Sequence, residues 1–160
     1  MRIGVVSDTH NNIKNVRKIV ELFNASGVDR VVHTGDITQA KTIEVFAHLE
    51  MPMYGVFGNN DEERETLEAA IDRYGFQFCE PPYQAIWAER EIIIVHDPLE
   101  FDGHLGGQDL ALHGHTHRYR SERLDGIEIF NPGECAGHMV GYNAIGVVNL
   151  NTLETELLKF

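Results

Sequence analysis

The sequence predicts an α/β protein made of two packed β-sheets, with helices on the outer face of the parallel part. The first half of the chain alternates short apolar runs with amphipathic helical patterns, which is typical of a parallel sheet. The second half contains short strands joined mostly by turns. A length of 160 residues fits one domain, so we expect a single domain over residues 1–160.

The elements of the first half follow from hydrophobic periodicity. Apolar runs predict strands at 2–7, 29–35 and 53–58. Apolar residues at helical spacing predict helices at 12–27, 42–49 and 61–75. Gly27 and Gly75 are the predicted stops of the first and third helices, and the third helix is expected to begin with an acid-rich turn.

The second half has no long helical pattern. Predicted strands lie at 83–88, 91–96, 109–114, 126–131, 143–150 and 154–160. The segment 96–108 is expected to be a loop with room for one helical turn.

Composition and charge exclude several classes of protein. Twenty-five acidic residues against thirteen basic ones give a formal charge of −12, which disfavours broad binding to nucleic acid or to anionic membranes. The longest apolar runs, such as 92–95, are too short to span a bilayer, and the N-terminus does not resemble a secretory signal. Cys79 and Cys135 form no paired motif, so we expect reduced thiols in a cytoplasmic protein.

Polar side chains follow the predicted strands, at the point where each strand ends. These residues are Asp8, His10, Asp36, Asn59, Asn60, Asp61, His96, His115 and His117. Taken singly, each could be a helix cap, a turn residue or a structural histidine. Because the carboxyl ends of strands in open α/β sheets form binding sites, we expect these side chains to converge.

The donor types predict two metal ions. Mixed carboxylate, imidazole and carboxamide ligands suit borderline cations, of which Mn²⁺ is favoured, with Ni²⁺, Fe²⁺ and Zn²⁺ as alternatives. Seven side chains are too many for one ion, whereas two neighbouring ions can share a carboxylate and a hydroxide.

The order of these motifs resembles the calcineurin-like metallophosphoesterases. The family's motifs read here as Asp8-Thr9-His10, Gly35-Asp36, Gly58-Asn59-Asn60-Asp61, His96, Gly114-His115-Thr116-His117 and Asn131-Pro132-Gly133. The short chain is similar to the small single-domain phosphodiesterase (YfcE-like) branch. The resemblance implies a four-layer α/β/β/α sandwich of two mixed sheets.

The resemblance also implies roles for the individual residues. It assigns Asp8, His10 and His117 to metal one; Asn59, His96 and His115 to metal two; and Asp36 to both as a bridge. A hydroxide bridging the metals would then attack the phosphorus of a phosphodiester in line. Asn60 and Asp61 complete the implied catalytic set. Asp61 is expected to orient a ligand histidine such as His10 by a hydrogen bond.

The chain departs from the family pattern at three positions. Asn60 replaces a histidine or cysteine, Val95 replaces a glycine, and Glu134 replaces a serine. Asn60 supplies only a neutral hydrogen-bond donor, so we expect activated aryl diesters to be hydrolysed better than alkyl esters. His113 and His33 match no family ligand and are interpreted as structural. His138 could reach the site or cap a loop, and the loop is the favoured interpretation.

The predicted function is therefore a dinuclear metal-dependent phosphoesterase acting on a small phosphodiester or nucleotide-type substrate. The alternative is a non-catalytic scaffold on the same fold, like a eukaryotic retromer subunit with an impaired metal site. The seven candidate ligands argue against that alternative. Assembly into a homo-oligomer stays open.

Overall fold

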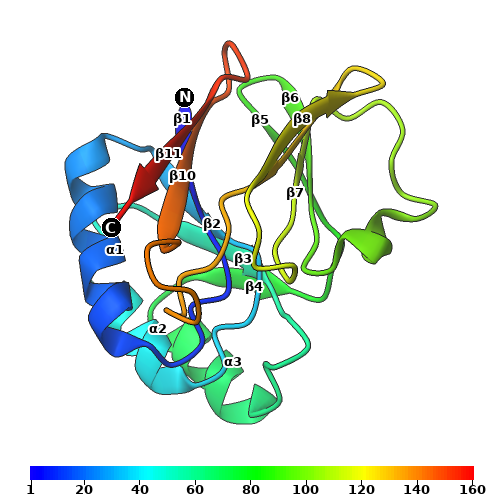
Figure 1. The fold of residues 1–160 in the computed structure, drawn as a ribbon. Helices are drawn as coiled ribbons and strands as arrows, with labels where there is room; N and C mark the ends of the chain where they lie inside the picture. The colour runs from blue at the N-terminus through cyan, green and yellow to red at the C-terminus, as the bar shows by residue number, and fades with distance from the viewer.

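The computed structural model describes residues 1–160 as two mixed β-sheets packed face to face, with three α-helices on one side (Figure 1). In chain order the elements are β1 (Arg2–Val6), α1 (Ile13–Ser26), β2 (Arg30–His33), α2 (Ala40–Phe46), β3 (Met53–Val56), α3 (Arg64–Arg73), β4 (Gln77–Cys79), β5 (Tyr83–Trp87), β6 (Arg90–Ile94), the 3₁₀ turn η1 (Pro98–Phe101), β7 (Leu110–Leu112), β8 (Arg120–Leu124), β9 (Ile127–Asn131), β10 (Ala144–Asn149) and β11 (Thr155–Lys159).

The first sheet has the strand order β11-β10-β1-β2-β3-β4. Strands β1, β2 and β3 are parallel, as the alternating pattern of the first half predicts, β4 adds a further parallel strand, and β10 and β11 join antiparallel. The second sheet has the order β5-β6-β7-β9-β8, with β6, β7 and β9 parallel. The parallel strands are central in the second sheet and extend to the edge strand β4 in the first, and within each set the carboxyl ends lie on the same side.

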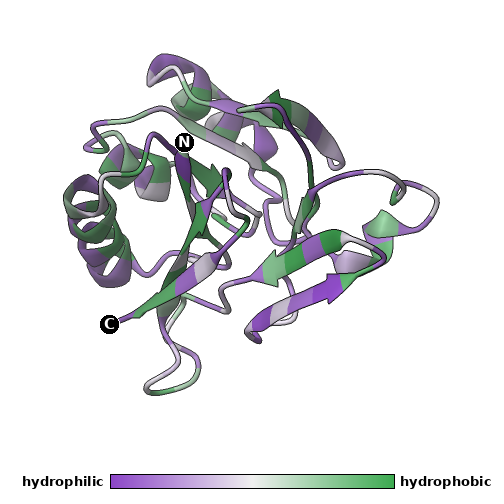
Figure 2. Ribbon diagram, turned by 90° about the horizontal axis from the view of Figure 1, so that it is seen from above, coloured by the Kyte–Doolittle hydropathy of each residue, from purple (hydrophilic) through white to green (hydrophobic).

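Three apolar layers hold the sheets and helices together. One core lies between the helices and the first sheet and includes Phe23, Phe46 and Leu67. A second core lies between the two sheets and includes Ile94 and Phe130. The helices show alternating hydrophilic and hydrophobic bands (Figure 2), as expected of helices with one face on a sheet.

The fourth layer of the sandwich, on the outer face of the second sheet, contains one short 3₁₀ turn and no α-helix. Only the turn η1 and its loop cover this face, and Phe101 packs there on Ile93, Val95, Ala111, Ile127 and Ile129. This turn lies where the sequence predicts a loop with one helical turn. None of the helices has the length and hydropathy required of a membrane-spanning segment.

Nine predicted strands and three predicted helices are confirmed, while β4 and β8 are not predicted from the sequence. β4 has only three residues, and β8 is an exposed edge strand whose polar sequence lacks alternating apolar residues. The predicted acid-rich start of α3 is wrong, because the helix begins at Arg64 and Asp61 lies in the preceding turn. Gly27 ends α1 in the left-handed conformation, as predicted.

One aromatic side chain joins the two sheets closely. The fully buried Phe130 ring of the second sheet lies over Gly146 of the first. A Cβ atom at position 146 would lie 2.3 Å from Phe130 Cε1. The glycine therefore permits this close approach, and the ring fills the space that the missing side chain leaves.

Phe130→Ala should lower the free energy of unfolding by about 3–5 kcal/mol, because it leaves a cavity between the sheets. Ile86→Ala, at a site 72% exposed on the same sheet, should change it by less than about 0.5 kcal/mol. Urea unfolding of both variants measures the difference. Equal effects would show that the contact between the sheets is not an important source of stability.

Candidate metal centre

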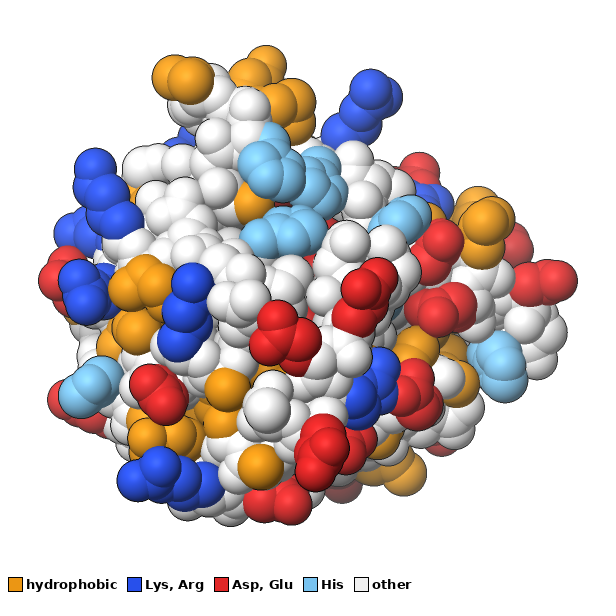
Figure 3. Space-filling view, turned by 90° about the horizontal axis from the view of Figure 1, so that it is seen from below, with side chains coloured by type: hydrophobic (Ala, Val, Ile, Leu, Met, Phe, Trp, Pro, Cys, Tyr) orange, Lys and Arg blue, Asp and Glu red, His pale blue; other side chains and the backbone are white.

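The predicted site residues converge at the carboxyl ends of the parallel strands. They lie in the loops that follow β1, β2, β3, β6 and β7, which bring segments distant in the sequence together. Figure 3 shows imidazole side chains gathered on the face of the molecule seen from below. The ring centroids of His10 and His117 are 5.6 Å apart.

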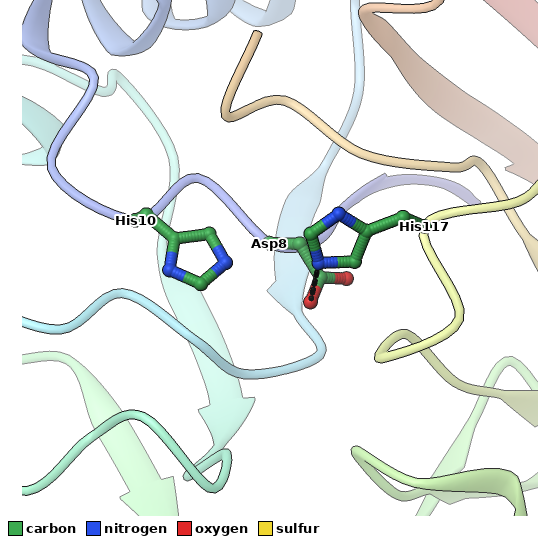
Figure 4. Close-up of side chains that lie close together, drawn as sticks. All are labelled: Asp8, His10 and His117. Carbon is green, nitrogen blue, oxygen red and sulfur yellow. Dashed lines mark ion pairs between the residues drawn. The ribbon is translucent and has the colours of Figure 1, made fainter. Parts of the chain in front are cut away.

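Asp8, His10 and His117 form the first group of donors. One candidate donor atom from each of the three side chains lies within 4.8 Å of the other two. Asp8 Oδ1 lies 3.3 Å from His117 Nε2, the ion pair marked by the dashed line in Figure 4. The other oxygen of Asp8 accepts hydrogen bonds from Ser7 Oγ and from the backbone N–H of His115, so the carboxylate has a fixed orientation.

Asn59, His96 and His115 form a second, tighter group. Asn59 Oδ1 lies 2.9 Å from His96 Nε2 and 3.1 Å from His115 Nδ1, and the two nitrogens are 3.2 Å apart. Two ligands at right angles around an ion, each with a bond of about 2.1 Å, lie about 3.0 Å apart. The spacing of these three atoms therefore matches adjacent positions in the coordination shell of one cation.

Asp36 lies between the two groups. Its Oδ2 atom is 3.7 Å from His10 Nε2 and 3.5 Å from His96 Nε2. Asn60 holds the same carboxylate, since its backbone N–H donates to Oδ1 at 2.9 Å and its amide donates to Oδ2 at 2.8 Å. Asp36 Oδ2 is thus within 3.7 Å of a candidate donor atom from each group.

Two atoms of this site that could bind a metal ion are buried without a hydrogen-bond partner. Asp8 Oδ1 and His10 Nε2 are both in this state. Burying such atoms without a partner is unfavourable unless a ligand satisfies them. The unpaired donors and the mixed oxygen and nitrogen set fit a divalent transition-metal ion.

Most of the candidate ligands have an unusual backbone conformation. The φ angles of Asp8, His10, Asp36, His115 and His117 lie between 44° and 64°, in the left-handed region that residues other than glycine rarely adopt. Such strain costs of order 1–3 kcal/mol per residue and persists where surrounding structure imposes it, often at functional sites. The fold holds five of the seven candidate ligands in this conformation.

Two glycines leave room for the donors. A Cβ atom at position 58 would lie 2.2 Å from Asp36 Oδ1, and one at position 114 would lie 1.9 Å from Ser7 Oγ and 2.8 Å from Asp8 Oδ2. The glycines of the two motifs are thus explained by the close approach of backbone to carboxylate.

The buried carboxylates control the protonation of the histidines. Burial disfavours the charged form of His96, but its contact with Asp36 outweighs this and raises the pKa of His96 to about 9. The pKa of His117 is raised mainly by its contact with Asp8. Burial opposes ionisation of Asp36, yet the hydrogen bonds from His96 and Asn60 hold the pKa of that carboxyl well below its usual range. In the metal-free protein, protonated His96 partly balances the buried negative charge.

Asp61 does not contact a ligand histidine, so the expectation of a hydrogen bond to His10 is wrong. Its buried carboxylate instead accepts hydrogen bonds from the backbone N–H groups of Gly58 at 2.6 Å, Thr38 at 2.6 Å and Asp36 at 3.0 Å. A carboxylate can satisfy several backbone donors at once, which an imidazole cannot. Asp61 therefore fixes the loops that carry Asp36 and Asn59 relative to each other.

The two histidines interpreted as structural lie in the interior. His33 accepts a hydrogen bond from the Gly35 N–H at Nδ1, and its Nε2 is 3.0 Å from Thr9 Oγ1. Burial lowers its pKa to about 3, so it is neutral and joins the first two loops of the site. His113 packs edge-on against Phe101, with Nδ1 3.0 Å from the carbonyl oxygen of Gly114.

His138 lies at the site rather than capping a loop, so the favoured interpretation of this residue is wrong. Its ring centroid is 5.3 Å from those of both His10 and His117. The sequence indicated no position for it, because residues 134–143 have no periodic pattern.

Two further contacts orient ligands and were not expected from the sequence. His96 Nδ1 is 2.8 Å from the carbonyl oxygen of Thr34, which points Nε2 toward the site. His115 Nε2 faces the Asp97 carboxylate at 3.6 Å, which leaves Nδ1 facing Asn59. The acid directly after His96 was the only sequence signal for the second contact.

Comparison with known proteins gives a match over almost the whole chain. The model of the calcineurin-like phosphoesterase superfamily domain matches residues 1–154. Phosphodiesterase MJ0936 from Methanocaldococcus jannaschii is 31% identical over 159 residues, covering 96% of each chain. Phosphodiesterase YfcE from Escherichia coli K12 is 25% identical over 155 residues, covering 83% of this chain and 78% of the relative.

Solved structures agree with this match. The structure of an archaeal phosphodiesterase has a TM-score of 0.90 and 32% identity, and the alignment covers all of both chains. A Vps29 variant from Entamoeba histolytica has a TM-score of 0.69 over 100% of this chain and 99% of its own, at 16% identity. The second likeness shows the fold alone.

Gly114→Ala should displace Asp8, because the added methyl group would overlap Ser7 Oγ and crowd Asp8 Oδ2. We expect a loss of about 1–3 kcal/mol in stability and at least a tenfold weaker affinity for Mn²⁺. Gly106→Ala is the matched control, since a Cβ atom there would meet nothing within 4 Å. Calorimetric titration with Mn²⁺ and thermal unfolding test both variants, and an unchanged Mn²⁺ affinity in Gly114→Ala would contradict the assigned position of Asp8.

Proposed function

Because the chain belongs to the calcineurin-like phosphoesterase superfamily, we propose that it is a phosphodiesterase with two divalent metal ions. One observation carries the proposal: six donor side chains form two groups, and Asp36 Oδ2 lies 3.7 Å from His10 Nε2 of one group and 3.5 Å from His96 Nε2 of the other. A chain of this family that keeps such a set is a metal-dependent phosphoesterase.

The proposed ligands divide as the two groups do. Asp8, His10 and His117 hold the first ion; Asn59, His96 and His115 hold the second; and Asp36 serves both. Mn²⁺ suits this mixture of oxygen and nitrogen donors best, ahead of Ni²⁺, Fe²⁺ and Zn²⁺. When bound, the two ions supply a water molecule that is nucleophilic near neutral pH and positive charge for the phosphate.

The remaining residues prepare the site. Asn60 donates two hydrogen bonds to Asp36 and so fixes the shared carboxylate. Asp61 fixes the two loops on either side of it. We propose that Asn60 and Asp61 contribute to catalysis by holding the metal ligands in position.

The substrate that we propose is a small phosphodiester, as the names of the relatives suggest. A hollow of about 270 Å³ lies beside the second group, bounded by Glu80, Asp97 and Glu100. These acids and the formal charge of −12 repel negative charge. They therefore favour a substrate whose phosphodiester is its only negative group over a polyanionic substrate. A nucleotide-type diester with an uncharged nucleoside fits these conditions. The two free thiols agree with the cytoplasmic location that we expect.

The alternative is a non-catalytic scaffold on the same fold. The Vps29 likeness, at 16% identity, supports only the shared architecture. A scaffold needs no set of donors held in strained backbone conformations, and here five of the candidate ligands are held in this way. The scaffold is therefore not favoured.

The bridging role of Asp36 gives the first test. Asp36→Asn removes the negative charge that both ions share, so activity on bis(p-nitrophenyl) phosphate should fall more than about a hundredfold and bound Mn²⁺ should fall with it. His48→Ala, at an exposed position after α2 that belongs to neither donor group, is the control and should retain both. A folded Asp36→Asn variant with wild-type activity and metal content would contradict the proposal.

The protonation of His96 gives the second test. Its folded pKa of about 9 lies above the ordinary value of 6.5, so in metal-free protein its contribution to stability is complete below about pH 6.5 and is lost as the pH rises through about 9. A metal ion must displace this proton. Affinity for Mn²⁺ should therefore rise about tenfold per pH unit between pH 6.5 and 8.5, with proton release measured by calorimetry in two buffers. A constant affinity over this range would show that His96 is not a ligand.

A further inference from the structure

The segment 134–143, which follows β9, lies beside the candidate metal centre, and the buried Glu134 holds its backbone in place. Glu134 is fully buried, and its two carboxylate oxygens accept hydrogen bonds from the backbone N–H groups of Gly137 and Met139, both at 2.9 Å. These two residues flank His138. The backbone on both sides of that histidine is therefore tied to one interior group.

Two side chains from the start of α1 fix the same segment from the other side. Asn12 Nδ2 donates to the carbonyl oxygen of Ala136 and Asn15 Nδ2 to that of Cys135, both at 2.8 Å. Gly137 adopts a φ of 79°, and a Cβ atom there would lie 3.0 Å from Asn12 Nδ2. The exposed His138 side chain therefore extends from a backbone that hydrogen bonds hold in place. Val140, two residues further along the same segment, is 96% exposed.

His138 lies next to the first group of ligands without belonging to it. Its plane is within 17° of that of His117, and the two ring centroids are 5.3 Å apart. The candidate donor atoms of His138 cluster with those of His117 and Glu134, whereas His117 clusters with Asp8 and His10 in the group assigned to the first ion. The His138 side chain is exposed, so a ligand bound beside the first group of donors can reach its imidazole.

The hydrogen-bond donors of Asn60, the neighbouring polar residue of the site, are directed at the protein itself. The amide of Asn60 donates to Asp36 Oδ2, and its backbone N–H donates to Oδ1 of the same carboxylate. These donors are engaged by an anion of the protein itself. The His138 imidazole, by contrast, has no hydrogen bond to the protein and is exposed beside His10 and His117.

We propose that His138 is a substrate-binding residue whose imidazole N–H donates a hydrogen bond to a non-bridging oxygen of the phosphoryl group. The proposal rests on the phosphoesterase function proposed above. It assigns the recognition of phosphate partly to the segment 134–143 and not only to the loops that carry the metal ligands.

The test compares three variants of the Mn²⁺-loaded protein. His138→Ala removes the donor, His138→Gln keeps an amide N–H of similar reach, and Val140→Ala is a control on the same segment. Inorganic phosphate is the probe, and its dissociation constant is measured by calorimetry alongside kcat and KM for bis(p-nitrophenyl) phosphate. Mn²⁺ content and affinity are measured in parallel.

A hydrogen bond to a charged group corresponds to roughly a tenfold to hundredfold change in affinity. We expect His138→Ala to weaken phosphate binding and to lower kcat/KM by that factor, with Mn²⁺ affinity within about twofold of wild type, His138→Gln in between, and Val140→Ala unchanged. Phosphate binding in His138→Ala equal to that in Val140→Ala would overturn the proposal. A parallel loss of Mn²⁺ would overturn it too, because His138 would then be a ligand.

The two proposals fail in different ways. If wild-type protein binds two Mn²⁺ ions but hydrolyses no diester, the proposed function fails. The phosphate-binding comparison still decides the role of His138 in that case, because it needs no turnover.

Discussion

The structure depends on the balance of charge around two buried carboxylates. Asp8 and Asp36 are both almost completely buried in neighbouring loops. Ionised carboxylates are costly to bury unless positive charge or hydrogen bonds compensate. The contact of His96 with Asp36, that of His117 with Asp8 and the donors of Asn60 supply this compensation without metal.

This balance links metal binding to folding. Under the proposed ligand set, a bound cation would replace the proton on His96, contact Asp8 Oδ1 and His10 Nε2, and offset the charge of both carboxylates. Because the unfolded chain lacks the assembled site, every ion bound to the native state stabilises it by mass action. Hydrogen bonds to the loops also account for the left-handed φ angles at five candidate ligands. Their strain is offset by hydrogen bonds such as those of Asp61 to the loop backbone.

The sequence predicts much of the fold and the location of the site, because both depend on local patterns. Alternating apolar runs identify the parallel strands, and the carboxyl ends of such strands meet at one edge. The polar β8 could not be found in this way, because an exposed edge strand needs no apolar alternation. The three-residue β4 is too short to give a pattern.

The details of the site that the sequence leaves open depend on contacts between distant segments. The carboxylate of Asp61 could serve a histidine or backbone amides, and only the approach of Thr38 and Gly58 decides between them. His138 lies in a segment without periodicity, and its position follows from the buried Glu134 beneath it. Such contacts are set by the packing of the loops, which composition and spacing do not determine.

The central claim is that Asp36 Oδ2 joins two ions in one centre. Anomalous diffraction at the manganese edge from a crystal of the Mn²⁺-loaded protein tests it most directly. The account predicts two peaks about 3.5–4 Å apart, one on each side of Asp36 Oδ2. A single peak, or two peaks that do not share Asp36 as a ligand, would contradict it.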